Sequence, residues 1–153
     1  MTKSTFNKNI CVVGGGNWGK NHIKTLHELD ELAAIVEPNE DLIILFSKMY
    51  PSIKIYKSLD EALKDKSLKG FVVATPAETH FEISKKLLLQ NKKILVEKPF
   101  TLNIANSKEL LSIEKESMGD IMVGHVMLFH PAIKKLKEII EIGEIGKIEY
   151  IYS

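Results

Sequence analysis

Arginine is absent from this chain of 153 residues, and all 21 basic residues are lysine. The guanidinium group, which binds phosphates and carboxylates through paired hydrogen bonds, is therefore missing from every site. The 20 acidic residues nearly balance the lysines, which leaves a net charge of +1 spread along the sequence. Because nucleic-acid-binding proteins carry a basic patch or a basic excess, we expect no nucleic-acid partner.

Cysteine and long hydrophobic runs are also scarce. Cys11 is the only cysteine, so a disulfide within the chain is excluded, as suits a reducing compartment. The longest apolar run, LIILF at residues 42–46, is far shorter than the roughly 20 residues that cross a bilayer. The first nine residues are polar and lack a signal-peptide pattern. The sequence thus predicts a cytoplasmic protein without a membrane partner, in which we interpret Cys11 as a core residue. We interpret LIILF as core as well, and the alternative is burial against a partner protein.

Short segments that are apolar throughout alternate with longer amphipathic ones. Strands that do not alternate between apolar and polar residues are typical of a parallel sheet that helices cover on both faces. The predicted strands are residues 10–13, 32–36, 53–56, 70–74, 93–97 and 120–126. Helices are predicted after the first strand with Ile23, Leu26 and Leu29 on one face, from about 39 to 49, after Ser58, and within 78–90, 101–117 and 131–140. The fold class is therefore α/β, with a doubly wound parallel sheet of the Rossmann type.

The pattern changes near the end of the chain. Residues 147–153, KIEYIYS, alternate like a half-exposed strand, which would begin a new sheet. We therefore expect a dinucleotide-binding domain over residues 1–125. Residues 126–153 are expected to be the linking helix and first strand of a second, α+β domain that is otherwise absent, so that the chain is truncated.

A glycine-rich loop follows the first predicted strand. Gly14, Gly16 and Gly19 form a G-x-G-x-x-G pattern, with Asn17 and Trp18 in its variable positions. The first glycine permits a tight turn, the second lets a pyrophosphate approach the backbone, and the third lets helix and strand pack closely. All five residues are candidate cofactor contacts, with the phosphates at the helix N-terminus. The pattern alone also fits a purely structural turn or the loop of a methyltransferase, and Trp18 fits either a cleft wall or packing beneath it.

Glu37 stands about 18 residues beyond the last of these glycines, at the end of the second predicted strand. A carboxylate there accepts hydrogen bonds from the adenosine ribose and repels a 2′-phosphate. Because no arginine is available to bind that phosphate, the sequence favours NAD over NADP as the cofactor. The alternative is a solvated carboxylate at a strand end.

Two later segments, VVATPAETHFEIS at 72–84 and ILVEKPF at 94–100, carry a resemblance to a known family. They resemble the N-terminal half of the Gfo/Idh/MocA family of NAD(P)-dependent sugar oxidoreductases, and the likeness runs through essentially the whole chain. The positions that match the family's Thr-Pro turn, helix-start histidine and Glu-Lys-Pro motif are Thr75, Pro76, His80, Glu97, Lys98 and Pro99.

The resemblance implies that these motifs lie beside the nicotinamide, with Thr75, Pro76, His80, Glu97 and Lys98 at the cofactor. It also implies that Lys98 is the catalytic residue. A lysine there hydrogen-bonds the oxygen that loses its proton as hydride leaves the adjacent carbon.

The segment GHVMLFHP at 124–131 resembles the branch of the family that acts on nucleotide-linked amino sugars, including UDP-N-acetylglucosamine-type 3-dehydrogenases. His125 is then a candidate contact of the nicotinamide or the sugar, while His130 replaces an arginine found in many members. Either histidine also fits a structural role, and no spacing of ligands predicts a metal site. We interpret His22 and His27 as structural or solvated.

The family's second domain supplies the substrate pocket, most oligomer contacts and an Asp/His pair. The chain is therefore expected to be the NAD-binding half of a homo-oligomeric sugar dehydrogenase, inactive or nearly so by itself. Two other classes stay open. The chain fits a module that senses NAD, or a non-catalytic subunit that a partner protein completes.

Overall fold

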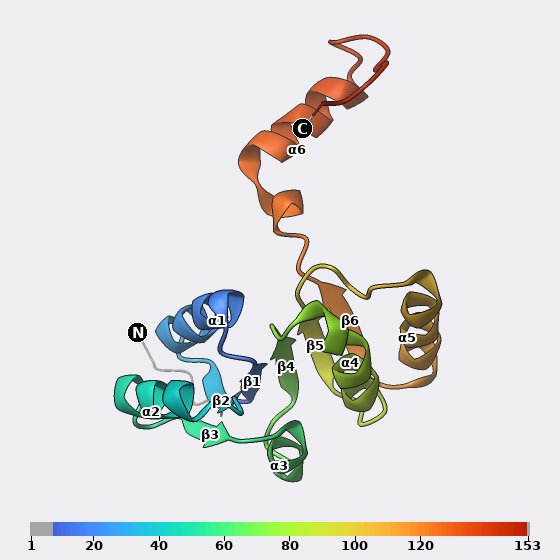
Figure 1. Ribbon diagram of the computed structural model, residues 1–153. Coiled ribbons are helices and arrows are strands. Elements are labelled where there is room, and N and C mark those ends of the chain that lie inside the picture. Colours follow the sequence, from blue (N-terminus) through green and yellow to red (C-terminus); the bar gives the residue numbers. More distant parts are fainter. Residues whose placement is uncertain (1–7, 153) are drawn as a thin grey trace, which may run out of the picture.

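The computed structural model describes residues 8–152. Residues 1–7, most of the segment without a signal-peptide pattern, lie outside the described residues, as does Ser153. Six strands form one sheet in the order β3-β2-β1-β4-β5-β6, and every neighbouring pair is parallel (Figure 1). The strands are β1 (Ile10–Val13), β2 (Leu32–Val36), β3 (Lys54–Tyr56), β4 (Gly70–Val73), β5 (Lys93–Val96) and β6 (Asp120–Val123).

Helices connect the strands at the predicted places. They are α1 (Asn17–Glu28), α2 (Glu40–Met49), α3 (Leu59–Lys64), α4 (His80–Leu88), α5 (Ile104–Glu116) and α6 (Pro131–Glu141), with short 3₁₀ turns η1 (Ala77–Thr79) and η2 (Val126–Phe129). The side chains of Asn39, Ser58 and Asn103 cap α2, α3 and α5 by accepting a hydrogen bond from a backbone N–H three residues later. The predicted doubly wound Rossmann-type fold is confirmed.

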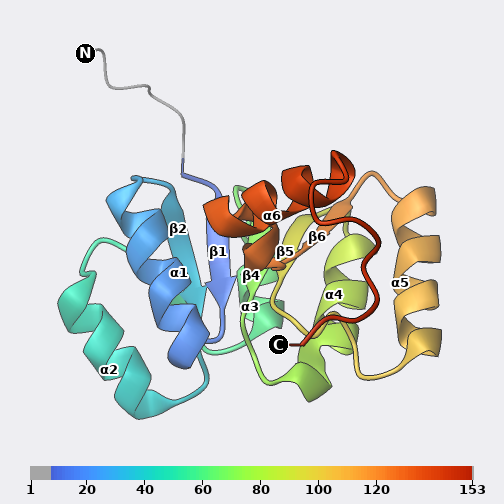
Figure 2. The same cartoon turned by 90° about the horizontal axis from the view of Figure 1, so that it is seen from above.

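The core has two layers, one on each face of the sheet. Ile23 of α1 and Phe46 of α2 pack on one face against Val12 and Ile35. Helices α3, α4 and α5 pack on the other face, where Cys11 lies fully buried. Figure 2 shows α1 and α2 over one half of the sheet and α4 and α5 over the other. Burial raises the pKa of the Cys11 thiol to about 12, since the charged thiolate is poorly solvated there.

Residues 147–152 form no strand among the described residues, where no neighbouring strand is present for them to bond to. That they begin the sheet of a second domain stays a prediction. The LIILF run is not simply core, since Ile44 and Leu45 are 53% and 41% exposed while Phe46 is buried. Five successive helical residues point in all directions around the axis, so only part of the run can face the sheet. The last predicted strand also ends earlier, at Val123.

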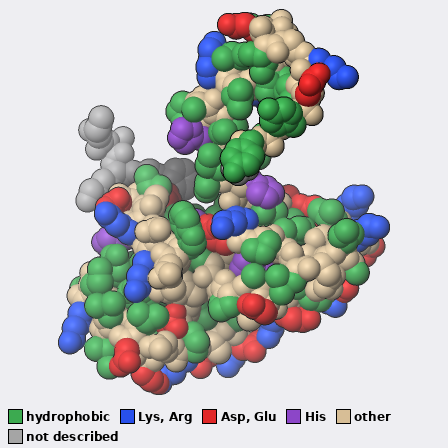
Figure 3. Space-filling model, turned by 45° about the horizontal axis from the view of Figure 1, so that its top comes forward, with side chains coloured by type: hydrophobic (Ala, Val, Ile, Leu, Met, Phe, Trp, Pro, Cys, Tyr) green, Lys and Arg blue, Asp and Glu red, His purple; other side chains and the backbone are tan. Residues whose placement is uncertain are grey.

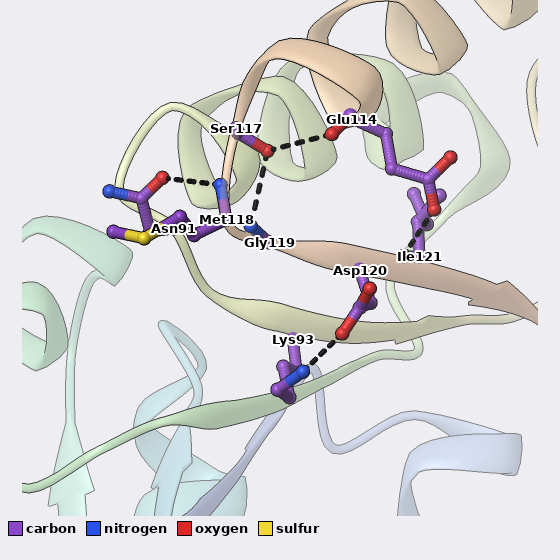
Figure 4. A network of polar contacts seen from close by, with 8 residues as sticks. All are labelled: Asn91, Lys93, Glu114, Ser117, Met118, Gly119, Asp120 and Ile121. Atoms are coloured by element: carbon purple, nitrogen blue, oxygen red, sulfur yellow. Dashed lines mark hydrogen bonds and ion pairs between the residues drawn. The ribbon is translucent and has the colours of Figure 1, made fainter.

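Polar contacts fix the edge strand β6 at its amino end (Figure 4). The Asn91 side-chain oxygen accepts a hydrogen bond from the Met118 backbone N–H at 2.9 Å. Glu114 accepts one from the Ile121 N–H at 3.1 Å, and Lys93 pairs with Asp120 across the two strands. These contacts lie at the opposite end of the strands from the site described below.

Helix α6 projects away from the sheet and contains no buried residue (Figure 1). Hydrophobic side chains are exposed along this projecting segment, including Leu128, Phe129 and Leu136 (Figure 3). The ring nitrogen Nδ1 of His130 accepts a hydrogen bond from the Ala132 N–H and so caps α6, which is a structural role. Over residues 8–152, the helices are too short or too polar for any of them to span a membrane.

Candidate functional site

A row of residues at the carboxyl ends of the strands forms the base of the site. In each case the first residue past the strand continues the hydrogen-bond ladder by donating its N–H to a carbonyl of the neighbouring strand at 2.8 or 2.9 Å. These residues are Gly14, Glu37, Ala74, Glu97 and Gly124, after β1, β2, β4, β5 and β6. The backbone thus holds motifs from distant parts of the sequence along one edge, where open parallel sheets bind their ligands.

The glycine loop leaves the start of α1 open to an anion. Gly14 has a φ of 93°, a conformation that favours glycine. Gly16 is the N-cap of α1, provides no side-chain cap, and is followed by a first turn without acidic residues. No atom lies within 4 Å of the place where a Cβ on Gly16 would stand. The first N–H groups of the helix therefore face open space, as binding of a pyrophosphate requires.

Glu37 is held rigidly beside this loop. The residue is only 6% exposed, and its carboxylate accepts hydrogen bonds from two backbone N–H groups, those of Gly15 (2.6 Å) and Asn39 (2.9 Å). A carboxylate oxygen has two lone pairs, so each oxygen retains capacity for a ribose hydroxyl. The sequence alone did not indicate that Gly15 and Asn39 bind the Glu37 carboxylate, although the run of three glycines pointed to a role for Gly15.

Most of the predicted cofactor residues line one cleft of about 560 Å³. They are Gly14, Gly16, Asn17, Trp18, Glu37, Thr75, Pro76, His80, Glu97 and Lys98. Trp18 is half exposed and forms part of the wall, which decides between its two interpretations. Gly19 does not line the cleft and instead lies buried where α1 packs against Gly14. His125 is exposed and is not among the lining residues, so the structure does not bring it to the cleft.

His80 joins the two loops that carry the Thr-Pro and Glu-Lys-Pro motifs. It is 1% exposed, and its Nδ1 and Nε2 lie 2.8 Å from the carbonyl oxygen of Pro99 and 2.9 Å from that of Thr75. Carbonyl oxygens only accept, so both bonds exist together only when both ring nitrogens carry a proton. The buried His80 therefore holds the two loops of the cleft in place. The second of these loops contains the cis peptide bond Lys98–Pro99.

One polar pair at the site was not expected. His22 of α1 lies with its Nε2 2.7 Å from Oε1 of Glu97, which is only 6% exposed. His22 had been interpreted as structural or solvated. The available signal was its position three residues after Gly19, on the helix that the glycine loop begins.

The comparison with known protein families agrees with this geometry. The sequence model of the oxidoreductase family with an NAD-binding Rossmann fold, Gfo/Idh/MocA, matches residues 8–125. The chain belongs to the Gfo/Idh/MocA family. Its part in that family is the NAD-binding oxidoreductase domain, and the predicted cofactor is confirmed at that level.

Relatives in the Gfo/Idh/MocA family carry several names. The uncharacterized oxidoreductase YhhX of Escherichia coli is 36% identical over 105 residues, which cover 69% of this chain and 30% of YhhX. The myo-inositol 2-dehydrogenase of Thermotoga maritima is 30% identical over 140 residues, which cover 90% of this chain and 42% of the enzyme. The crystal structure of GenD2 from gentamicin A biosynthesis, in complex with NAD, superposes with a TM-score of 0.82 at 25% identity and covers 94% of this chain and 43% of GenD2. The chain thus spans less than half the length of each of these relatives.

The residues in the cleft fit an NAD molecule from end to end. The open N-terminus of α1 suits the pyrophosphate, and the fixed Glu37 carboxylate suits the ribose of the adenosine half. Thr75, Glu97 and Lys98 line the same cleft past the ends of β4 and β5, which leaves room for the rest of a dinucleotide. No group of three or more His, Cys, Asp or Glu side chains in the described range is placed to hold a metal ion.

Proposed function

We propose that this domain is the NAD-binding half of a dehydrogenase that oxidises a ring hydroxyl of a sugar or cyclitol. The observation that carries the proposal is that Lys98 and Glu37 line the same cleft from different strands. Glu37 follows β2 and Lys98 follows β5, with β1 and β4 between them. At about 4.8 Å per strand the two ends are separated by roughly 14 Å, which suits an extended dinucleotide lying across the strand ends.

At the end of the cleft opposite Glu37, the exposed Lys98 side chain is the group that takes part in the chemistry. Bound NAD supplies the hydride acceptor. Oxidation of an alcohol removes a hydride from carbon, which the nicotinamide accepts, and a proton from the hydroxyl oxygen, which passes to a base or to water. The Lys98 side chain hydrogen-bonds that oxygen and stabilises the negative charge that develops on it as the proton leaves. The Glu97 N–H bonds to the Val73 carbonyl oxygen, and the Thr75 carbonyl oxygen lies 2.9 Å from His80, so the ends of β5 and the neighbouring β4 are held in place.

Two substrate classes fit the proposal, and each has its own support. The Gly-His and His-Pro pattern of residues 124–131 favours a nucleotide-linked amino sugar. The name of the Thermotoga maritima relative, which is 30% identical, favours a cyclitol such as myo-inositol. Both present a secondary ring hydroxyl to the same amine.

We further propose that residues 126–153 belong to a second domain rather than to the Rossmann domain. The support is the projection of α6, none of whose residues is buried, and the exposure of the apolar side chains before and along it. Such a surface is typical of a segment that another domain covers.

The first experiment is a fluorescence titration with NADH and then NADPH, in which Trp18 transfers energy to the bound nicotinamide. Saturable transfer that is stronger with NADH supports the site, and calorimetry covers the case of a poorly oriented indole. The second experiment incubates NAD with myo-inositol or a UDP-N-acetyl amino sugar and follows NADH formation. It uses both this chain and any longer form of the protein that contains it. NADH formation that survives Lys98→Met would refute the assigned role of Lys98.

A further inference from the structure

The hydrogen bond between His22 and Glu97 joins helix α1 to a residue that lines the cofactor cleft. His22 lies on α1, the helix whose N-terminus faces the proposed pyrophosphate position, and Glu97 begins the loop that carries Lys98. The two residues are 75 positions apart in the sequence. The bond joins β1 and its helix to β5, on opposite sides of the point where the strand order reverses between β1 and β4. It is therefore a direct link between the two halves of the dinucleotide site.

The surroundings of Glu97 make this link the main restraint on its side chain. Among the hydrogen bonds of residues 8–152, His22 provides the one that reaches the Glu97 carboxylate. On another side, a Cβ placed on Gly124 would stand 3.4 Å from the carboxylate, so β6 closes that direction. A carboxylate on a side chain that is 8% exposed loses most of its hydration and needs a donor in return. Since an ionised carboxylate only accepts, the proton of this bond resides on Nε2 of His22.

We propose that His22 is a positioning residue for the nicotinamide half of the site. By holding Glu97, it fixes the Glu-Lys-Pro loop relative to the phosphate-binding helix. It does not touch the adenosine half, where Gly15 and Asn39 hold Glu37 independently. The inference rests on the proposed function for the role of Lys98 in chemistry, but the binding effect depends only on the two halves being linked.

The test compares NADH with ADP, which lacks the nicotinamide half, in calorimetric titrations of the chain. For His22→Ala we expect NADH affinity to fall about tenfold, equal to 1.4 kcal/mol, because a charge-assisted hydrogen bond is lost. ADP affinity should stay within about twofold of wild type, since an energy difference that small is typical of contacts left intact. Retained ADP binding also shows that the variant is folded.

Two further variants make the comparison sharper. In His22→Gln, the side-chain amide can still donate to Glu97, so part of the NADH affinity should return. His27→Ala is the matched control, because His27 lies on the same helix but packs edge-on against Tyr50 at 4.8 Å between ring centres. It should leave the affinity for both ligands unchanged.

A spectroscopic measurement tests the bond itself. In nitrogen-15 spectra of the imidazole groups, the Nε2 signal of His22 should show the strong hydrogen bond to a carboxylate, and Glu97→Ala should shift that signal toward the value of a free imidazole. The inference is overturned if His22→Ala weakens ADP and NADH equally, if NADH affinity does not change, or if the Nε2 signal is insensitive to Glu97. Those three outcomes concern His22 alone and leave the proposed function standing. A wild-type chain that binds ADP but not NADH would instead refute the proposed function, so the two failures are distinguishable.

Discussion

Substitution by alanine should affect two glycines of the same loop differently, lowering stability at Gly19 and weakening NADH binding at Gly16. A Cβ on Gly19 would stand 1.9 Å from the carbonyl oxygen of Gly14, where ordinary contact begins near 3.4 Å. The Gly14 oxygen belongs to the backbone and the added Cβ is fixed to the backbone of α1, so α1 must move away from β1 to make room. A Cβ on Gly16 meets no atom within 4 Å, and the φ of Gly16, −68°, suits any residue.

The expected magnitudes follow from these contacts. Overpacking of Gly19→Ala should cost about 3 kcal/mol, the upper end of the usual range, because neither partner is a flexible side chain. Alanine regains about 1 kcal/mol as the better helix former, which leaves a net loss of about 2 kcal/mol in the free energy of unfolding. Gly16→Ala should cost no more than about 1 kcal/mol, because alanine is only a poorer N-cap. Its methyl group, however, occupies the space proposed for the pyrophosphate.

Urea unfolding and NADH titration of both variants check this reasoning. Gly19→Ala should lower the midpoint of unfolding by about 1 M, from a slope of about 2 kcal/mol per molar urea. Gly16→Ala should unfold close to wild type but bind NADH at least about tenfold more weakly. A wild-type midpoint for Gly19→Ala would show that the close approach of α1 to β1 is not real. Normal NADH binding by Gly16→Ala would show that the phosphates lie elsewhere.

Three further predictions concern single side chains. Glu37→Gln removes the charge that repels a 2′-phosphate, so the preference for NADH over NADPH should fall at least about tenfold in parallel titrations. Hydrogen bonds from Lys54, Ser67 and Tyr56 lower the pKa of Asp65. The contribution of Asp65 to stability is therefore complete above its unfolded pKa of about 3.9 and is lost as the pH falls below that value. Between neutral and strongly acidic pH, the urea midpoint of Asp65→Asn should consequently drop less than that of the wild type. Burial raises the pKa of Cys11 to about 12, so a thiol reagent should modify it only after urea unfolds the protein; rapid reaction of the native protein would contradict this burial.

The sequence by itself determined the elements of this fold and most of the residues of the cleft. Strands buried on both faces and helices with one apolar face are local patterns, which require no knowledge of the rest of the chain. The glycine loop, Glu37 and the Glu-Lys-Pro motif each directly follow a strand. Because all strands are parallel, such positions necessarily gather at one edge of the sheet, and the site could be predicted from them.

Local patterns are not sufficient where a partner decides the structure. Alternation over residues 147–152 predicts a strand, but a strand forms only when another segment completes its hydrogen bonds, and none of the described segments does so. This expectation therefore stays a prediction about a second domain. The histidine at position 125 follows a strand like the other site residues, yet its side chain is exposed outside the cleft. A strand-end position fixes where the backbone lies and leaves the direction of the side chain open.

Only the tertiary structure decided which polar groups meet. His22 reaches Glu97 across 75 residues, and His80 bridges the carbonyl groups of two loops. Glu37 accepts a hydrogen bond from the N–H of Gly15, and the ring of Phe46 from α2 packs so close to Gly15 that a Cβ there would clash with it. These contacts depend on the order β2-β1-β4-β5 and on how each helix packs over the sheet, and residue spacing carries no information about either. The sequence therefore determined which residues reach the site, and packing determined how they are held there.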